Sequence, residues 1–590
     1  MGLKKVWKFK EKGEDADVNH LMDVLGVVRP IANLLVQRNI TTLEQAKSFF
    51  RPSINSLHDP FLMKDMAKAV ERITTAIKND EKILVYGDYD VDGTSAVALV
   101  YSFLSKLTTH IDFYIPNRYS EGYGISFKGI DFAAEHNFKL VITLDCGIKA
   151  TEKILYGKEK GVDFIIGDHH HPGDTLPEAY AVLNPKRRDC LYPYKELSGC
   201  GVGFKLVQGL AHKLNIPFED IKHYLDLVTI SIAADVVPIT GENRVMAFHG
   251  LDRINKNPRP GIEAALRSGG IKRRPESLAK VDYNFTKYIT ISDLVFVVGP
   301  RVNAAGRIDT GKNSVLLLLS QTLEESESLA NIINDFNNER KSFDKLAFED
   351  ALSKLNSSPE LQKKKTTVLF DPQWHKGVVG IVASRLIEHY YKPTIIFTES
   401  NGLLTGSARS VKDFDLYQAV EACSHLIEHF GGHKFAAGLS IKPENFDAFC
   451  QEFERLASES LTDEMMIPEI EIDDAINFSE IVPKFIRLLK QFAPFGPGNM
   501  SPIFITENVY DTGYSRPIGE NHVKLNITQP DFKGAGFDAI AFGFGHLFQQ
   551  IHDEQLPFKV CYHIEENEWN GKVTVQLNVK DIVIDEASDS

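Results

Sequence analysis

Short apolar runs alternate with helix-length segments in the first half of the chain. The runs have the length and composition of buried strands and lie at residues 82–87, 111–115, 139–144 and 162–166. Helical patterns separate them at residues 94–107, 127–136 and 149–160. Strands that alternate with helices predict a parallel sheet covered on both faces, so we expect an α/β fold.

The rest of the chain shows other hydrophobic patterns, which predict further domains. A helix-prone region runs from residue 275 to about 361, and a second region with the α/β pattern follows from 366 to about 453. From about 468, runs rich in Val, Ile and Phe between Gly, Pro and Asn indicate mostly β-structure. We therefore expect a helical region at 1–75, a first α/β domain at 76–270, a helical connector at 271–362, a smaller α/β domain at 363–457 and a β-rich domain at 465–585.

Composition narrows the class of protein. A chain of 590 residues is too long for a single hydrophobic core, so several domains are expected. Its content of 43% hydrophobic and 25% charged residues is typical of folded proteins. No run approaches the ~18 apolar residues of a membrane span, the N-terminal segment lacks a signal-peptide pattern, and the six cysteines form no CxxC pair. These features predict a cytoplasmic protein with no membrane partner. The net charge of −14 is only weak evidence against nucleic acid, because phosphate binding needs just a local basic surface.

Acidic residues and histidines follow the predicted strands. They are Asp88, Asp90 and Asp92 after the first strand, Asp145 after the third, and Asp168, His169, His170 and His171 after the fourth. A further acid, Asp235, ends an apolar helical run. Each group alone is more often a helix cap or a solvated turn. Their conjunction favours one cleft, because the carboxyl ends of parallel strands meet at one edge of the sheet.

Carboxylates gathered in one cleft repel one another unless cations neutralise them. Oxygen ligands with one or two histidines suit Mn²⁺ or Mg²⁺, and two such ions ~3.5–4 Å apart can clamp a phosphodiester and activate water. The sequence therefore predicts a two-ion phosphodiesterase site. It contains no GxxxxGK[ST] loop, so ATP-driven unwinding is not expected.

These segments resemble the motifs of the DHH phosphoesterase superfamily, and their order and spacing are similar to those of the RecJ family. The similarity covers about residues 75–505 and includes 88–94, 145–148, 168–170, 197–205, 234–238 and 299–307. Residues 377–385, 406–410 and 430–438 resemble the companion DHHA1 domain, and 495–504 the start of an OB-fold. Cys200 and Gly203 stand where the family pattern leads us to expect larger or different small residues, and this departure affects the expected packing rather than the chemistry. The resemblance implies a parallel-sheet DHH domain joined by a long helix to a smaller α/β DHHA1 domain and followed by a β-rich OB-fold.

The resemblance also implies roles for individual residues. The implied metal ligands are Asp88, Asp90, Asp92, Asp145, His169 and Asp235, with Asp92 and Asp145 as bridging ligands and Asp88 as a ligand or an outer-shell group. Asp168 and His170 are catalytic candidates that orient ligands or meet the scissile phosphate, and His171 is expected in a loop. The implied DNA contacts are Arg118, Arg301, Asn303, Arg307, Arg409 and His433, with Arg118 in a stretch that recognises the 5′ end in the family.

The predicted function is a single-stranded-DNA-specific 5′→3′ exonuclease that uses two Mn²⁺ or Mg²⁺ ions in DNA recombination and repair. The implied partners are single-stranded DNA, a helicase and a single-strand-binding protein. One alternative is a DHH phosphodiesterase acting on cyclic dinucleotides or short oligonucleotides, which segments 299–307 and 495–504 disfavour. The other is a non-catalytic DHH-like replication scaffold, which the full set of acids and histidines disfavours.

Overall fold

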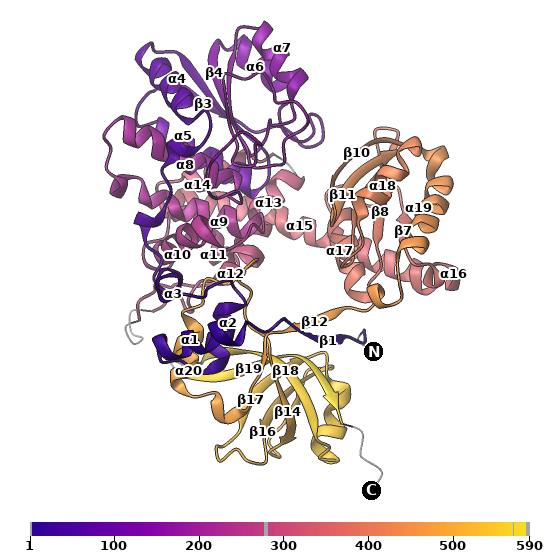
Figure 1. The fold of residues 1–590 in the computed structure, drawn as a ribbon. Coiled ribbons are helices and arrows are strands. Elements are labelled where there is room, and N and C mark those ends of the chain that lie inside the picture. The colour runs from indigo at the N-terminus through magenta and orange to yellow at the C-terminus, as the bar shows by residue number, and fades with distance from the viewer. Residues whose placement is uncertain (1–2, 276–280, 309, 570–571, 586–590) are drawn as a thin grey trace.

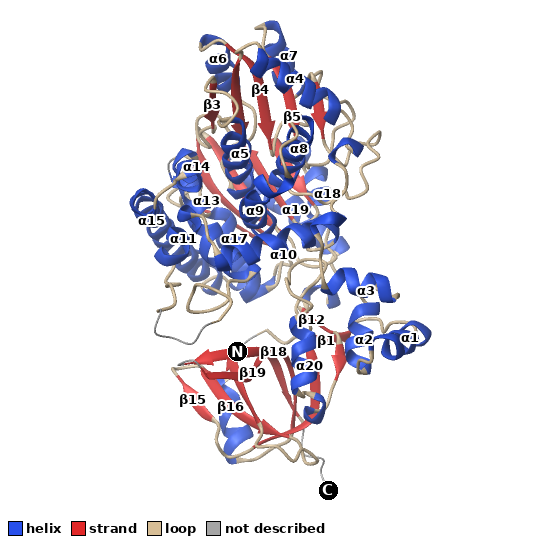
Figure 2. Ribbon diagram, turned by 90° about the vertical axis from the view of Figure 1, so that its left-hand side faces the viewer, coloured by secondary structure: helices blue, strands red, loops and turns tan. Residues whose placement is uncertain are grey.

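The chain folds into two α/β lobes and a β-barrel, with a long helix between the lobes (Figures 1 and 2). The structure is a computed structural model and describes residues 3–275, 281–308, 310–569 and 572–585. Within those residues, no helix has the length and apolar character needed to cross a membrane.

The first lobe is built on a parallel sheet with the strand order β3-β2-β4-β5-β6. Its strands are β2 (Lys82–Gly87), β3 (Ile111–Tyr114), β4 (Phe138–Leu144), β5 (Asp163–Gly167) and β6 (Ala181–Leu183). The helices of this lobe are α4 (Met66–Lys78), α5 (Val91–Leu104), α6 (Phe127–Glu135), α7 (Thr151–Glu159), α8 (Gly199–Lys213), α9 (Leu225–Ala234), α10 (Gly241–Lys256) and α11 (Pro260–Ser268).

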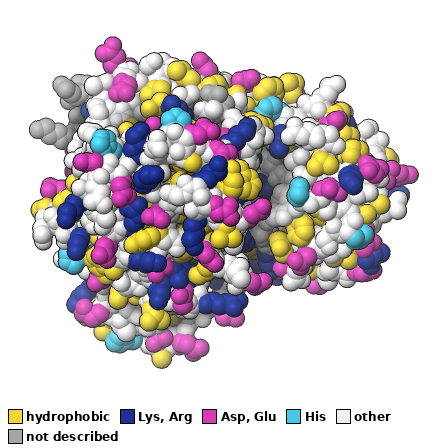
Figure 3. Space-filling view, turned by 90° about the horizontal axis from the view of Figure 1, so that it is seen from above, with side chains coloured by type: hydrophobic (Ala, Val, Ile, Leu, Met, Phe, Trp, Pro, Cys, Tyr) yellow, Lys and Arg dark blue, Asp and Glu magenta, His cyan; other side chains and the backbone are white. Residues whose placement is uncertain are grey.

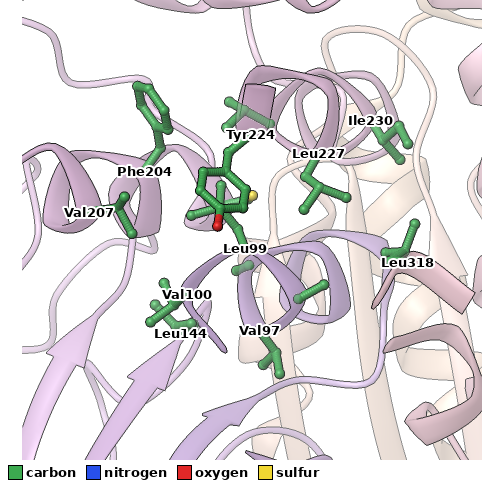
Figure 4. Packing of buried hydrophobic residues seen from close by; sticks show 14 of the residues in the cluster. Val97, Leu99, Val100, Leu144, Phe204, Val207, Tyr224, Leu227, Ile230 and Leu318 are labelled. Carbon is green, nitrogen blue, oxygen red and sulfur yellow. The ribbon is translucent and has the colours of Figure 1, made fainter. Parts of the chain in front are cut away.

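Two hydrophobic cores cover the two faces of this sheet. On one face, Val97 and Val100 of α5 pack with Leu144 of β4, Phe204 of α8 and Leu227 of α9 (Figure 4). The other face packs against α6 and α7. The predicted α/β fold with a covered parallel sheet is confirmed, and helix α5 is apolar nearly all round because it is buried nearly all round.

A helical connector leads from the first lobe to the second. It contains α12 (Ile291–Asp293), the π-helical turn η5 (Leu294–Val298), α13 (Gly299–Ile308), α14 (Lys312–Leu319), the long α15 (Leu323–Asn356) and α16 (Pro359–Lys363). The second lobe has a mixed sheet in the order β10-β11-β9-β8-β7. Its elements are β7 (Thr367–Phe370), α17 (Val379–Tyr390), β8 (Thr394–Ser400), β9 (Leu403–Arg409), α18 (Leu416–Ala422), β10 (Ile427–His433), β11 (Ala436–Ile441) and α19 (Phe446–Ser460).

The C-terminal part forms a barrel that shares its core with the N-terminal helices. Pairing of β14 with both β18 and β16 closes the barrel. Its elements are β13 (Asp474–Ala475), α20 (Pro483–Lys490), β14 (Phe504–Asp511), β15 (Arg516–Ile518), β16 (His522–Thr528), β17 (Phe537–Phe542), β18 (Phe558–Trp569) and β19 (Lys572–Ile584). Helices α1 (Asp15–Leu25), α2 (Arg29–Val36) and α3 (Leu43–Phe50) pack into the same hydrophobic cluster.

One pairing was not predicted from the sequence. Strand β1 (Val6–Phe9) runs parallel to β12 (Glu469–Ile472), with Val6 opposite Glu469 and Phe9 opposite Ile472. The sequence indicated only helices in residues 1–75. A strand this short acquires its partner from a segment more than 450 residues away, which a local pattern does not report.

Candidate metal centre and nucleic-acid cleft

Acidic and histidine side chains converge where three neighbouring strands of the first sheet end. Asp88 follows β2, Asp145 follows β4, and Asp168 begins the segment after β5. These strands are adjacent in the sheet, so their carboxyl ends lie side by side. Asp235 reaches the same place from the C-terminal end of α9, where its N–H donates to the carbonyl of Ser231.

His169 lies at the centre of this cluster. Its Nε2 is 3.2 Å from Oδ1 of Asp145, 3.5 Å from Oδ2 of Asp235 and 3.7 Å from Oδ2 of Asp92. Two overlapping groups therefore each place three ligand atoms within 4.8 Å of one another: Asp92, His169 and Asp235, and Asp145, His169 and His170. Such groups have the spacing of ligands around a metal ion.

Buried polar atoms in the cluster lack protein partners. His169 is 5% exposed, and neither of its ring nitrogens makes a hydrogen bond. Burial lowers the pKa of His169, which favours the neutral imidazole that binds metal ions. Oδ2 of Asp88 is likewise buried without a partner. Because unsatisfied buried polar atoms are costly, this arrangement fits a cation bound among them.

The carboxylates are destabilised in their ionised form. Burial, and then the charge of Asp92, raises the pKa of Asp90, of Asp145 and of Asp235, the last to about 8. Burial and Asp90 raise the pKa of Asp88 well above its usual range. A divalent cation would offset this repulsion, so the donor set of carboxylate oxygens and imidazole suits the expected Mn²⁺ or Mg²⁺.

Asp92 is held by the N-terminus of α8. Its Oδ2 accepts the N–H of Gly199 at 2.7 Å, and its Oδ1 accepts the N–H of Cys200 and the hydroxyl of Ser231, each at 2.7 Å. The first N–H groups of a helix have no partner within the helix, so they are free to orient a carboxylate. The helix approaches closely: a Cβ on Gly199 would lie 2.6 Å from Cβ of Asp145.

Asp168 orients His170. Oδ1 of Asp168 lies 2.8 Å from Nδ1 of His170, and Oδ2 accepts the N–H of Ile148 at 2.9 Å. Burial would raise the pKa of Asp168, but these bonds and the charge of His170 lower it to about 2. Burial lowers the pKa of His170, but the bond to Asp168 outweighs it and the pKa is raised. The Tyr123 hydroxyl lies 3.3 Å from the other ring nitrogen of His170.

Arg118, Arg307 and Arg409, three of the predicted DNA contacts, lie close together near the junction of the two lobes, where Nη1 of Arg307 donates to the carbonyl of Gly377 at 2.7 Å. Figure 3 shows a hollow between the lobes. Burial lowers the pKa of Arg307 to about 10, and the nearby charges of Arg118, Arg340 and Arg409 contribute. In the described part of the chain, none of these four guanidiniums forms an ion pair with a carboxylate. Positive charge that is half-buried and unpaired with a carboxylate fits an anionic ligand.

The remaining predicted contacts are placed differently. Asn303 faces the acidic segment, where its Oδ1 accepts the N–H of Val91 at 3.1 Å. Arg301 is 8% exposed and donates to the carbonyls of Val297 and Ser268. His433 lies exposed at the end of β10, and its pKa is lowered by burial and by Arg409.

Sequence reasoning missed two contributors to the site. Arg340 lies in the middle of the long α15, within a polar stretch that carries no local sign of ligand binding. Ser231 is an inward-facing residue of α9 and bonds Asp92 only because the two helices pack together. The one available signal was the Ser-Gly-Cys-Gly start of α8, where small residues permit close approach to the acids.

Comparison with known proteins agrees with this geometry. Family models match in chain order: the DHH family N-terminal domain at residues 82–232, the DHHA1 domain at 363–459 and the RecJ OB domain at 472–581. The single-stranded-DNA-specific exonuclease RecJ of Bacillus subtilis is 35% identical, over 98% of this chain and 71% of that protein. Its counterpart in Escherichia coli is 33% identical, over 88% of this chain and 90% of that protein.

This chain belongs to the RecJ family. The crystal structure of RecJ in complex with Mn²⁺ from Thermus thermophilus superposes with a TM-score of 0.82 at 26% identity, covering 99% of this chain and 80% of that one. The Mg²⁺ complex of the same RecJ gives a TM-score of 0.76 at 25% identity. The predicted DHH, DHHA1 and OB-fold architecture of the RecJ family is therefore confirmed.

Proposed function

We propose that this chain is a metal-dependent exonuclease specific for single-stranded DNA that acts in recombination and repair. The observation that carries the proposal is His169, whose buried and unpartnered imidazole lies among the carboxylates of Asp92, Asp145 and Asp235. Membership of the RecJ family, whose curated members carry this activity in their names, supports the same conclusion.

The residues that would hold two Mn²⁺ or Mg²⁺ ions are Asp88, Asp90, Asp92, Asp145, His169 and Asp235; among them, Asp92, His169 and Asp235 form one close group, and Asp145 and His169 belong to a second. Bound ions supply Lewis-acid activation of water and neutralise charge on the phosphate. The hydrogen bond to Asp168 raises the pKa of His170 and so favours its imidazolium, which can donate to a phosphate oxygen. The N-terminus of α8 fixes the carboxylate of Asp92 before substrate arrives.

The arginines at the junction of the two lobes would bind the DNA backbone and set the direction of degradation. Arg118 and Arg409 are both close enough to Arg307 to lower its pKa, and Arg307 donates to the carbonyl of Gly377 in the second lobe. A terminal phosphate carries more charge than an internal phosphodiester, so an arginine cluster would favour a phosphorylated strand end, which we propose is the 5′ end. Asn303 would act indirectly by fixing the acidic segment, and His433 would contact the strand from the second lobe.

The remaining proposals concern the barrel, the partner proteins and the cellular location. The barrel would bind the single strand beyond the site, as OB-folds do with aromatic and cationic side chains. A helicase and a single-strand-binding protein would deliver single strands. All six cysteines are free thiols, which supports a reducing, cytoplasmic location.

Long single-stranded DNA labelled at either end, incubated with Mn²⁺ or with chelator, tests the proposal. We expect metal-dependent release of nucleotides from the 5′ end and little attack on duplex DNA. Release from the 3′ end would contradict the polarity. Cleavage of dinucleotides alone would favour a small-nucleotide phosphodiesterase, and no cleavage of either substrate would favour a non-catalytic scaffold.

A further inference from the structure

The segment that leads into the barrel, residues 495–499, packs on the first lobe just after Asp235. The carbonyl of Pro497 accepts the N–H of Ile239 at 2.7 Å. A Cβ on Gly496 would lie 2.5 Å from Cγ1 of Ile239. Gly498 has a φ of +73°, and a Cβ there would lie 2.9 Å from the side chain of Thr240. The glycines therefore allow a backbone contact that larger residues would prevent.

The contact lies beside a strained residue. Val236 follows Asp235 directly and has a φ of +57°, which a β-branched residue adopts only when its surroundings hold it there. Its side chain is 59% exposed, so side-chain packing does not supply that restraint. The restraint comes from the residues that follow: the carbonyl of Pro238 accepts from the Tyr194 hydroxyl at 3.2 Å and from Nδ2 of Asn243 at 3.0 Å.

The segment itself is anchored on its far side. Arg244 of α10 donates to the carbonyls of Phe492, Ala493 and Pro494 at 2.9, 3.0 and 3.2 Å. Asn499 is 1% exposed and donates to the carbonyls of Phe492 and Pro494, each at 2.8 Å. The barrel linker, held by Arg244 and Asn499, thus packs on residues 238–240, which follow Asp235 in the chain.

We propose that residues 495–499 are a positioning element of the metal centre. The segment fixes the chain direction after Asp235 and thereby the place of its carboxylate in the group with Asp92 and His169. The identity of the ion rests on the proposed function. The other ligand group shares His169 with this one, but no described hydrogen bond joins the segment to Asp145 or His170, so we expect that group to be affected less.

The test uses the full-length protein with Gly498→Ala. Mn²⁺ binding is measured by calorimetry and by electron paramagnetic resonance. We expect the affinity of one of the two Mn²⁺ sites to fall about 10-fold, as when a group that orients a metal ligand is altered. Affinity for single-stranded DNA in chelator, measured by fluorescence anisotropy, should not change. The matched control is Gly402→Ala, which also replaces a glycine of positive φ (+76°) but has nothing within 4 Å. That variant should bind Mn²⁺ like the wild type.

A second set of variants keeps the proposal testable if Gly498→Ala fails to fold. Gly496→Ala should weaken Mn²⁺ binding at the same site, and adding Ile239→Ala should restore it in part, because the clashing Cγ1 is removed. Wild-type Mn²⁺ affinity in folded Gly498→Ala and Gly496→Ala would overturn the proposal, and so would equal weakening in Gly402→Ala. Because Mn²⁺ binding is read directly, failure of the exonuclease assay would count against the proposed function and leave this inference standing.

Discussion

At the residue scale, Asp92 and Asp235 face the same imidazole but are held differently. Asp92 accepts hydrogen bonds from Gly199, Cys200 and Ser231, whereas Asp235 faces His169 and is about a third exposed. We expect Asp92→Ala to abolish cleavage and to lower the free energy of unfolding by roughly 1–3 kcal/mol for each buried donor left unpaired.

Asp235→Ala is the matched variant for this prediction. It should also abolish cleavage, but without loss of stability in the absence of metal, because it removes a carboxylate that neighbouring charges disfavour. Urea unfolding in chelator, together with the exonuclease assay, separates the two effects. Equal stability losses in both variants would contradict the contacts assigned to Asp92.

The raised pKa of Asp235 gives a pH dependence with a definite sign. Its folded-state pKa is about 8, above the roughly 3.9 of an unfolded Asp, so the folded protein binds the extra proton between these values. The stability contributed by this proton is present at lower pH and is lost as the pH rises through about 8. In chelator, the melting temperature should therefore fall between pH 6.5 and 8.5. Asp235→Asn, which does not titrate, should make that slope shallower in thermal unfolding, the rest coming from Asp88, Asp90 and Asp145, whose pKa values are also raised. An unchanged slope would refute the assignment.

At the scale of elements, the N-terminus of α8 packs closely against Asp92 and Asp145. A Cβ on Gly199 would lie 2.6 Å from Cβ and 2.9 Å from Cα of Asp145, and backbone cannot yield as a flexible side chain can. We expect Gly199→Ala to displace the helix from Asp92 and to reduce the exonuclease rate at least 10-fold. In Gly201→Ala, two residues along the same helix, the nearest neighbours of the new Cβ would be Ser198 and Leu197 at 3.3 Å or more, so this variant should retain most of the rate. Similar rates for the two variants would show that the close approach is unimportant.

The same scale shows what the sequence can and cannot predict. Strand ends in a parallel sheet converge by topology alone, so Asp88, Asp145 and Asp168 could be assigned to one cleft before any coordinates. The donors that orient Asp92 could not, because α8 starts over 100 residues later and its N–H groups are backbone atoms without a residue signature. Arg301 shows the converse, since its motif fits phosphate binding while its guanidinium donates to two carbonyls inside the fold.

At the scale of the whole molecule, Arg244 joins parts of the chain that are distant in sequence. Arg244 is 5% exposed, and its guanidinium donates to the carbonyl of Phe49 in the last turn of α3 and to those of residues 491–494 before the barrel. Burial, and then the charge of Arg38, lowers the pKa of Arg244 to about 9. One side chain of the first lobe therefore holds both the N-terminal region and the barrel linker.

We expect Arg244→Lys to uncouple these parts. An ammonium keeps the charge but cannot match a planar guanidinium that reaches several carbonyls at once, so the junction should lose about 2–4 kcal/mol. Because the barrel and the N-terminal helices share one core, they should then unfold together and before the first lobe, which would appear in calorimetry as two transitions. Arg267→Lys, at an exposed ion pair with Glu327, should leave the profile unchanged. An unsplit profile in Arg244→Lys at the wild-type melting temperature would mean that the shared core and the β1–β12 pairing hold the barrel in place without this arginine.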